Sequence, residues 1–180
     1  MSSTVEVQKT LDVVLDLVKK ELGKERIRML DLPCGDFVWM KHFLKTRTDI
    51  EYTGIDIAGL LTENHQRTYS TETSWHFKQN DIVKNSLPMK FDLIFSRQMT
   101  QHLETRDTMN VLEHFSQSGQ YLLITNYPDV KSNTPLIKTK WRFRPQNLNI
   151  SPFHLADPVC EDTEDGCINA LHRLSLRQWL

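Results

Sequence analysis

Apolar residues recur along the chain in two periodicities, one typical of amphipathic helices and the other of buried strands. Over residues 4–22 they fall at helical spacing between lysines and acids, which predicts a helix that packs on a sheet. Further helices are expected over 37–46, 58–69 and 105–116. Short apolar runs predict strands over 26–32, 51–57, 74–79, 91–96 and 120–126, and a final antiparallel strand over 171–179.

This alternation of helices and strands predicts the fold class. It indicates an α/β protein with one doubly wound, mostly parallel sheet and helices on both faces. The 180 residues fit a single domain over 1–180, which begins with the helix within 1–24. The segment 127–170 is rich in Pro, Asn and Asp, and we expect it to form functional loops.

The candidate chemistry is concentrated where the first expected strand enters a turn. Asp31 closes the apolar run, Gly35 lies in the turn, and Asp56 closes the next strand 21 residues after Gly35. Two strand–helix units in this register predict a nucleoside site across the carboxyl ends of the first two strands. The turn lacks the G-x-G-x-x-G pattern of dinucleotide folds, which disfavours a nicotinamide oxidoreductase.

The acids near this turn favour a nucleoside with a cationic amino-acid end and no phosphate. Asp36 would repel a diphosphate at the mouth of the next helix. The sulfonium and ammonium groups of S-adenosylmethionine suit Asp31 and Asp36, and its ribose diol suits Asp56. Gly35 would leave room for the ligand. A second role for Asp36 stays open, because a carboxylate also favours the N-terminus of a helix.

The run from Asp31 to Phe37, DLPCGDF, resembles the first motif of class I S-adenosylmethionine-dependent methyltransferases, D/E-x-G-x-G-x-G. Pro33 and Phe37 stand at its first and third glycine positions. The run is more similar to a small subgroup that carries D-L-P-C-G-D-F-x-W-M and is often linked with methylation of polysaccharides or other small acceptors. The resemblance extends over residues 26–180 and implies the seven-stranded methyltransferase fold.

The same resemblance implies further contacts with the cofactor. Asn80, Asp81 and Ile82 follow the third strand, where this fold binds adenine. A turn role explains Asn80 equally well, which makes Asp81 the better candidate. The complete expected cofactor set is Asp31, Pro33, Gly35, Asp36, Trp39, Asp56, Ile57, Asp81, Ile82, Ser96 and Arg97.

The residues after the fourth strand should face the transferable methyl group. The D/N-P-P-Y element of many amino-directed methyltransferases is absent there, which favours O-methylation, with a base that takes the hydroxyl proton. His102 is the first candidate base, although a packing or capping role is open, and His154 is the second. Gln98 is expected to face the acceptor.

Basic and aromatic residues alternate over 138–144, and three of them, Trp141, Arg142 and Arg144, are expected to hold the acceptor within a lid. Two other interpretations are open: a nucleic-acid contact, and a loop whose aromatic side chains close the sheet edge. The net charge of -1 argues against nucleic acid as a partner.

The expected function is therefore methyl transfer from S-adenosylmethionine to a hydroxyl of a small molecule or glycan. The alternatives are a cofactor-binding pseudoenzyme or interaction module, and a methyltransferase that acts on protein or nucleic acid. No C-x-x-C pair or histidine spacing indicates a metal site. With no long apolar run, a cytoplasmic location is expected; a secretory one stays open if the chain is trimmed and Cys160 pairs with Cys167.

Overall fold

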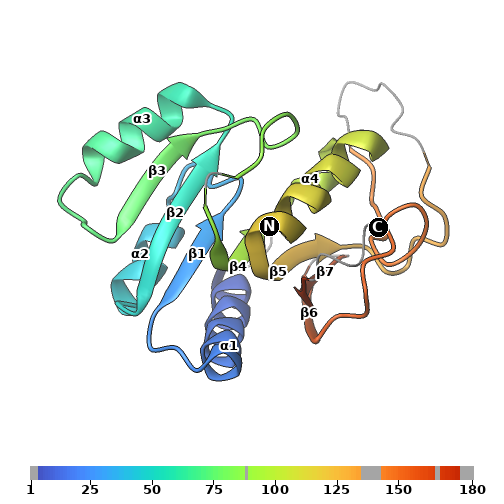
Figure 1. The fold of residues 1–180 in the computed structure, drawn as a ribbon, viewed down its shortest axis with the longest axis horizontal. Coiled ribbons are helices and arrows are strands. Elements are labelled where there is room, and N and C mark those ends of the chain that lie inside the picture. Colours follow the sequence, from blue (N-terminus) through green and yellow to red (C-terminus); the bar gives the residue numbers. More distant parts are fainter. Residues whose placement is uncertain (1–3, 88, 135–142, 165–166, 175–180) are drawn as a thin grey trace.

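The fold is a seven-stranded sheet with helices on both faces, seen in a computed structural model (Figure 1). The structure describes residues 4–87, 89–134, 143–164 and 167–174. The strand order is β3-β2-β1-β4-β5-β7-β6, in which β1 to β5 pair in parallel and β7 is antiparallel to β5 and β6. The predicted fold class is confirmed.

The elements follow one another as the hydrophobic pattern predicts through the first five strands. The helices are α1 (Thr4–Leu22), α2 (Met40–Thr46), α3 (Gly59–Thr68) and α4 (Thr105–Ser118), with a 3-10 turn η1 (Thr100–His102). The strands are β1 (Ile27–Asp31), β2 (Ile50–Asp56), β3 (Trp75–Gln79), β4 (Phe91–Ser96), β5 (Gly119–Asn126), β6 (Cys160–Glu164) and β7 (Cys167–Arg173).

Two expectations near the C-terminal end were wrong. Residues 160–164 and 167–170 were expected in loops, whereas they form β6 and the first part of β7. β6 has an acidic sequence with no apolar alternation, and it is a strand because it pairs with β7 at the sheet edge. β7 begins at Cys167 because its apolar side chains are already buried there, four residues before the predicted start.

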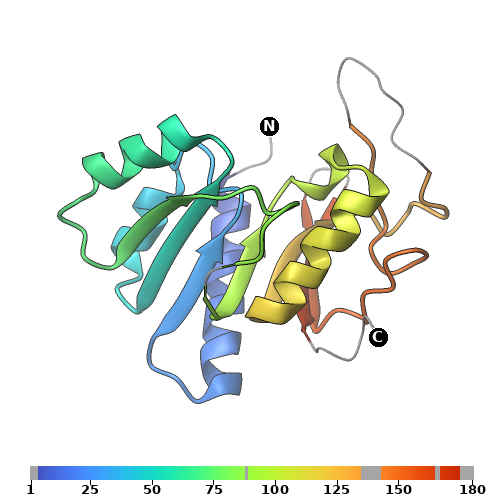
Figure 2. The same cartoon turned by 45° about the horizontal axis from the view of Figure 1, so that its top comes forward.

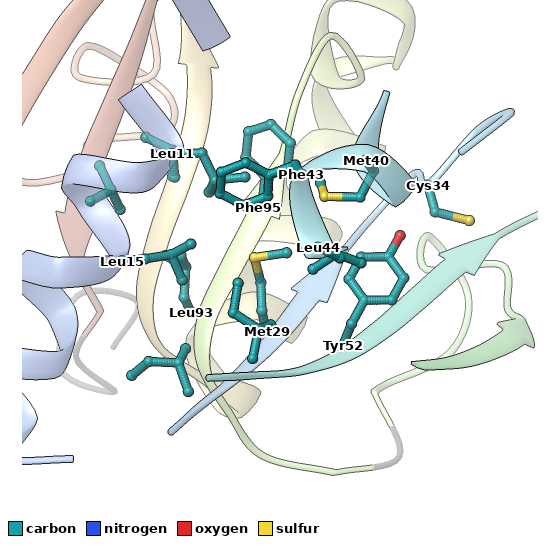
Figure 3. Packing of buried hydrophobic residues seen from close by; sticks show 14 of the residues in the cluster. Leu11, Leu15, Met29, Cys34, Met40, Phe43, Leu44, Tyr52, Leu93 and Phe95 are labelled. Atoms are coloured by element: carbon teal, nitrogen blue, oxygen red, sulfur yellow. The ribbon is translucent and has the colours of Figure 1, made fainter. Parts of the chain in front are cut away.

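The sheet separates two apolar cores. The first core lies beneath α1 and α2, and it includes Leu11 and Leu15 of α1 and Leu93 of β4 (Figure 3). The second lies on the opposite face, where α4 supplies Val111 and Phe115. Figure 2 shows α1 and α4 on opposite sides of the sheet. The apolar stripe of each helix thus determines which side of the helix is turned toward the sheet.

Loop residues complete the second core. Leu148, Phe153 and Leu155 lie in the segment between β5 and β6, and all three are buried. The described part of the segment between β5 and β6 is therefore anchored to the body of the domain by apolar packing.

A pairing of Cys160 with Cys167 is not observed, and both thiols are free. The register places Cys160 opposite Leu171 and Cys167 opposite Glu164, so the cysteines lie four residue pairs apart on the hairpin. At ~3.4 Å per residue this is about 14 Å along the strands, roughly twice the largest Cα separation that a disulfide allows.

Candidate functional site

Three charged side chains meet where β2, β1 and β4 end. Asp31 pairs with Gly54 of β2 and Phe95 of β4, and Asp56 and Arg97 lie two residues beyond those partners. Because side chains alternate along a strand, Asp31 and Asp56 lie on the same face of the sheet as Met29 and Tyr52, the face covered by α1 and α2. The charges of Asp56 and Arg97 both act on Asp31. The sheet thus presents two carboxyl groups and one guanidinium group, in this order, on neighbouring strands at its carboxyl edge.

The turn after β1 is tied to β2 and α3. Asp56 accepts hydrogen bonds from the backbone N–H of Gly35 at 3.1 Å and from that of Ala58 at 3.0 Å. The Nε2 of His65, a buried residue of α3, lies 2.9 Å from the carbonyl oxygen of Gly35, which fixes the Nε2–H tautomer as the donor. Asp56 and His65 therefore hold both polar groups of the Gly35 backbone.

The surroundings of Gly35 explain why a glycine is needed there. Its φ is +52°, in the left-handed region that side chains other than glycine adopt at a cost. A Cβ at this position would meet no protein atom within 4 Å, so the space above the turn is open. Asp36 is exposed and accepts a hydrogen bond from the N–H of Val38 at 3.0 Å, within the turn that precedes α2.

Gly54 is required by packing. A Cβ there would lie 2.9 Å from both Phe77 Cδ1 and the Tyr52 hydroxyl, and 3.1 Å from the Cβ of Cys34. Cys34 is buried, and desolvation raises the pKa of its thiol well above the ordinary range. Cys34 is therefore a neutral thiol that packs against Gly54 of β2.

Asp31 is a buried acid that accepts a hydrogen bond from a neighbouring side chain. The Tyr52 hydroxyl donates to its Oδ2 at 2.9 Å. Desolvation raises the pKa of Asp31 to about 7, and the charge of Asp56 acts in the same direction, whereas the Tyr52 hydrogen bond and the charge of Arg97 oppose the rise. Since a buried carboxylate is costly without a cation, a cationic ligand would stabilise the ionised form.

The end of β3 supplies a short polar turn. The Asn80 N–H donates to the carbonyl oxygen of Asp56 at 3.1 Å, which brings the ends of β2 and β3 together. Asp81 accepts a hydrogen bond from the Val83 N–H at 3.2 Å and forms a salt bridge with Lys84, and the hydrogen bond with Lys84 lowers the pKa of Asp81. Ile82 is buried, whereas Ile57 beyond β2 is 64% exposed.

The end of β4 is linked to the antiparallel strands. Ser96 is buried, and its Oγ has no hydrogen-bond partner among the described residues. Arg97 pairs with Glu164 of β6. Gln98 has a φ of +55°, and its N–H donates to Thr125 Oγ1 at 3.0 Å.

The Gln98 side chain lies within a polar network. Its Oε1 accepts hydrogen bonds from Gln101 Nε2 at 2.5 Å and from the Tyr127 hydroxyl at 3.4 Å. Its Nε2 lies 3.5 Å from the Sγ of Cys167. Burial raises the pKa of Tyr127 to about 12, so this hydroxyl acts as a donor at neutral pH. The amide of Gln98 is thereby oriented at the carboxyl edge of β4.

The two candidate bases lie in different segments. His102 is exposed at the end of η1, and its ring lies 5.8 Å from that of Phe143. His154 is also exposed and follows buried Phe153 in the loop before β6, with a φ of +51°. Phe143 is 50% exposed and also contacts the ring of Tyr127. The described aromatic contacts join His102, and not His154, to the edge of β4 and β5.

Arg144 packs against the segment that follows β4. Its backbone N–H donates to the Gln101 carbonyl at 2.8 Å, and its Nη2 lies 3.4 Å from both the Leu103 carbonyl and Thr105 Oγ1. The side chain is buried, and desolvation lowers its pKa. The two other lid residues, Trp141 and Arg142, lie outside the described residues.

Amide side chains organise the chain between β5 and β6, which the sequence did not indicate. Asn126 Oδ1 accepts hydrogen bonds from the N–H groups of Tyr127 and Leu148, and its Nδ2 donates to Asn149 Oδ1 at 2.6 Å. Gln146 donates to the Thr100 carbonyl at 2.9 Å. Such bonds satisfy backbone groups that have no strand partner, and they connect this segment to η1.

Two negative findings apply to the described part of the chain. Within it, no group of three or more His, Cys, Asp or Glu side chains could hold a metal ion. No helix there is long and apolar enough to cross a membrane.

Comparison with known protein families identifies the segment that contains these residues. The family model of the methyltransferase domain matches residues 29–118, half of the chain. That segment contains Asp31, Gly35, Asp56 and Arg97. No curated protein matches the sequence significantly.

Solved structures share the fold at low sequence identity. LaPhzM is 10% identical with a TM-score of 0.62, over 82% of this chain and 49% of its own. A putative sarcosine dimethylglycine methyltransferase from Galdieria sulphuraria is 14% identical (TM-score 0.55; 67% and 45%). An O-methyltransferase of a trans-AT PKS multienzyme from Brevibacillus brevis, in complex with S-adenosyl-L-homocysteine, is 15% identical (TM-score 0.53; 69% and 43%).

The chain spans less than half the length of each of these three structures. Their similarity to this chain is a similarity of fold. The family model, in contrast, matches the sequence of the segment that contains the site residues. With half of its residues matched by that model, the chain belongs to the methyltransferase domain family.

Proposed function

We propose that the protein transfers a methyl group from S-adenosyl-L-methionine to a hydroxyl group of a small molecule or glycan. The main observation in support of this cofactor is the arrangement of Asp56 and Asp31 beside the open turn at Gly35. A carboxylate can accept hydrogen bonds from both hydroxyls of a diol and can pair with an ammonium group, and the turn leaves space for a ligand at Gly35.

The described residues fit this cofactor by their chemistry. Asp56 would accept hydrogen bonds from the ribose hydroxyls, and Asp31, with Asp36 nearby, would hold the ammonium group. Exposed Ile57 and the turn at Asp81 and Ile82 offer an apolar surface and polar groups for adenine. The other proposed contacts come from the turn after β1 and the end of β4, and they are Pro33, Trp39, Ser96 and Arg97.

The proposed acceptor lies beside the ends of β4 and β5. Bound S-adenosylmethionine supplies a methyl group already activated by its sulfonium. His102 is proposed to take the hydroxyl proton, since it is exposed beside the Phe143 ring. Gln98, whose amide is fixed by three neighbours, is proposed to orient the acceptor, with Arg144, Trp141 and Arg142 from the expected lid. His154 is the second candidate base.

A direct experiment tests this proposal. The purified protein is titrated with S-adenosylhomocysteine by calorimetry and then incubated with methyl-labelled cofactor and a panel of phenols, sugars and uronic acids, each beside its deoxy or O-methylated analogue. Binding, with label transferred only to the hydroxyl-bearing member of a pair, is the expected result. Binding without transfer to any acceptor, including amines, peptides and RNA, would favour the pseudoenzyme, and transfer to an amine would overturn O-methylation.

Cofactor affinity is expected to depend on pH through Asp31. Because its pKa of about 7 lies above the ordinary 3.8, the free protein binds a proton that an ammonium ligand must displace. Affinity for S-adenosylhomocysteine should fall below pH 7, by up to about tenfold per pH unit. The stability that the free protein gains from this proton should be complete below pH 4 and lost as pH rises through 7.

Calorimetric titrations between pH 5.5 and 8.5 check this dependence. The Tyr52→Phe variant removes a hydrogen bond that lowers the pKa of Asp31, so its affinity should rise at a higher pH than that of the unchanged protein. 5′-Methylthioadenosine, which lacks the ammonium group, should bind with little pH dependence. The same pH profile for both ligands would contradict the role of Asp31.

A further inference from the structure

An ion pair joins the end of β4 to the far edge of the sheet. The Nε of Arg97 lies 3.0 Å and 3.2 Å from the two carboxylate oxygens of Glu164, and Nη2 also contacts Oε1. The Glu164 side chain is 3% exposed, and Asn169 Nδ2 donates to its Oε2 at 2.7 Å. This two-pronged geometry fixes the plane of the guanidinium as well as its position.

The pair crosses two intervening strands. In the sheet order β4-β5-β7-β6, Arg97 follows β4 and Glu164 ends β6. Asn169 of β7 lies opposite Thr125 of β5, and their side chains are 3.4 Å apart. A polar path of Arg97, Thr125, Asn169 and Glu164 therefore runs along the carboxyl edge, continuous with Asp31 and Asp56 on the other side of Arg97.

The charges along this edge match the polarity of an α-amino acid. Asp56 and Asp31 end β2 and β1, and Arg97 follows β4, so two negative groups are succeeded by a positive one on neighbouring strands. Neighbouring strands are about 4.8 Å apart. The cofactor carries a ribose diol, then an ammonium and a carboxylate on one carbon, and this order would place the carboxylate toward Arg97.

We infer that Glu164 is a positioning residue, which holds the guanidinium of Arg97 where it receives the carboxylate of the cofactor's amino-acid end. The inference rests on the proposed cofactor. Glu164 itself touches neither cofactor nor acceptor in this scheme. It acts by fixing Arg97, with Asn169 holding its second oxygen. A pair that served stability alone would make no distinction between ligands with and without a carboxylate.

Two ligands that differ only at that group provide the test. S-Adenosylhomocysteine and its decarboxylated analogue share adenosine, thioether and amine, and each is titrated by calorimetry into the unchanged protein and Glu164→Gln. We expect Glu164→Gln to weaken S-adenosylhomocysteine about tenfold and the analogue by less than about twofold, since a misaligned charged hydrogen bond is what is lost. Arg97→Lys, which keeps the charge but not the fork, should show the same selectivity.

Glu161→Gln is the matched control, because it removes the same charge from an exposed position of the same strand. It should leave both affinities unchanged. Retained binding of the analogue by Glu164→Gln shows that the site is folded. Equal weakening of both ligands, or no weakening of either, would overturn the inference while the proposed cofactor stands. Failure of the folded, unchanged protein to bind either compound would overturn the proposed cofactor, and the inference with it.

Discussion

Replacement of Asp56 by alanine is expected to weaken S-adenosylhomocysteine binding by more than about a hundredfold. The carboxylate would accept both ribose hydroxyls, and each hydrogen bond to a charged group is worth about 1.5–3 kcal/mol. The same side chain accepts the N–H groups of Gly35 and Ala58, so its removal also releases the turn that the ligand must cross. Calorimetric titration of the variant beside the unchanged protein measures the loss.

Two further variants separate the causes of this loss. Asp56→Asn keeps an acceptor for the Gly35 N–H but loses the charge, and we expect an intermediate affinity. Glu51→Gln, at the opposite end of β2, removes an acid from the same strand and should leave binding unchanged. An Asp56→Ala protein that binds within about threefold of the unchanged one would show that the ligand does not lie across the end of β2.

The acids at the ends of β1 and β2 could be predicted because their signal is local. Asp31 and Asp56 each close an apolar run, and buried parallel strands give such runs without the help of partners. The turn after β1 was harder to predict. Its helix was expected from residue 37 but begins at Met40, because Phe37 has a φ of +59° and is buried beneath the turn.

Contacts made by residues far apart in sequence could not be predicted. Glu164 reaches Arg97 over 67 positions, from a strand whose acidic sequence resembles a loop. His65 could have been suspected from the sequence, because it lies on the buried face of α3, which has few apolar residues. Its partner, the carbonyl oxygen of Gly35, is seen only in the folded structure. The structure at such residues depends on the segments that pack against them, and a single sequence does not show which segments those are.

Truncation of Phe37 is expected to give the largest loss of stability. The side chain is 1% exposed, and its ring contacts five others, those of Tyr52, His65, Tyr69, Trp75 and Phe77, with centroids 4.9–5.8 Å away. Phe37→Ala should lower the free energy of unfolding by about 3–5 kcal/mol, a large part of the stability of a domain. Urea unfolding followed by fluorescence measures it, with Val38→Ala, at a 55% exposed neighbour, as the control.

The backbone at Phe37 makes a second comparison decisive. Glycine in place of alanine normally costs about 0.5–1 kcal/mol, but at a φ of +59° alanine carries a penalty of about 1–2 kcal/mol that glycine avoids. Phe37→Gly should therefore be at least as stable as Phe37→Ala. A glycine variant clearly less stable than alanine would show that the left-handed turn is not retained once the ring is gone. If the glycine variant is at least as stable as the alanine variant, the aromatic ring of Phe37 supplies the stability at this position, the third glycine position of the family motif. The burial of the ring then offsets the cost of the left-handed φ.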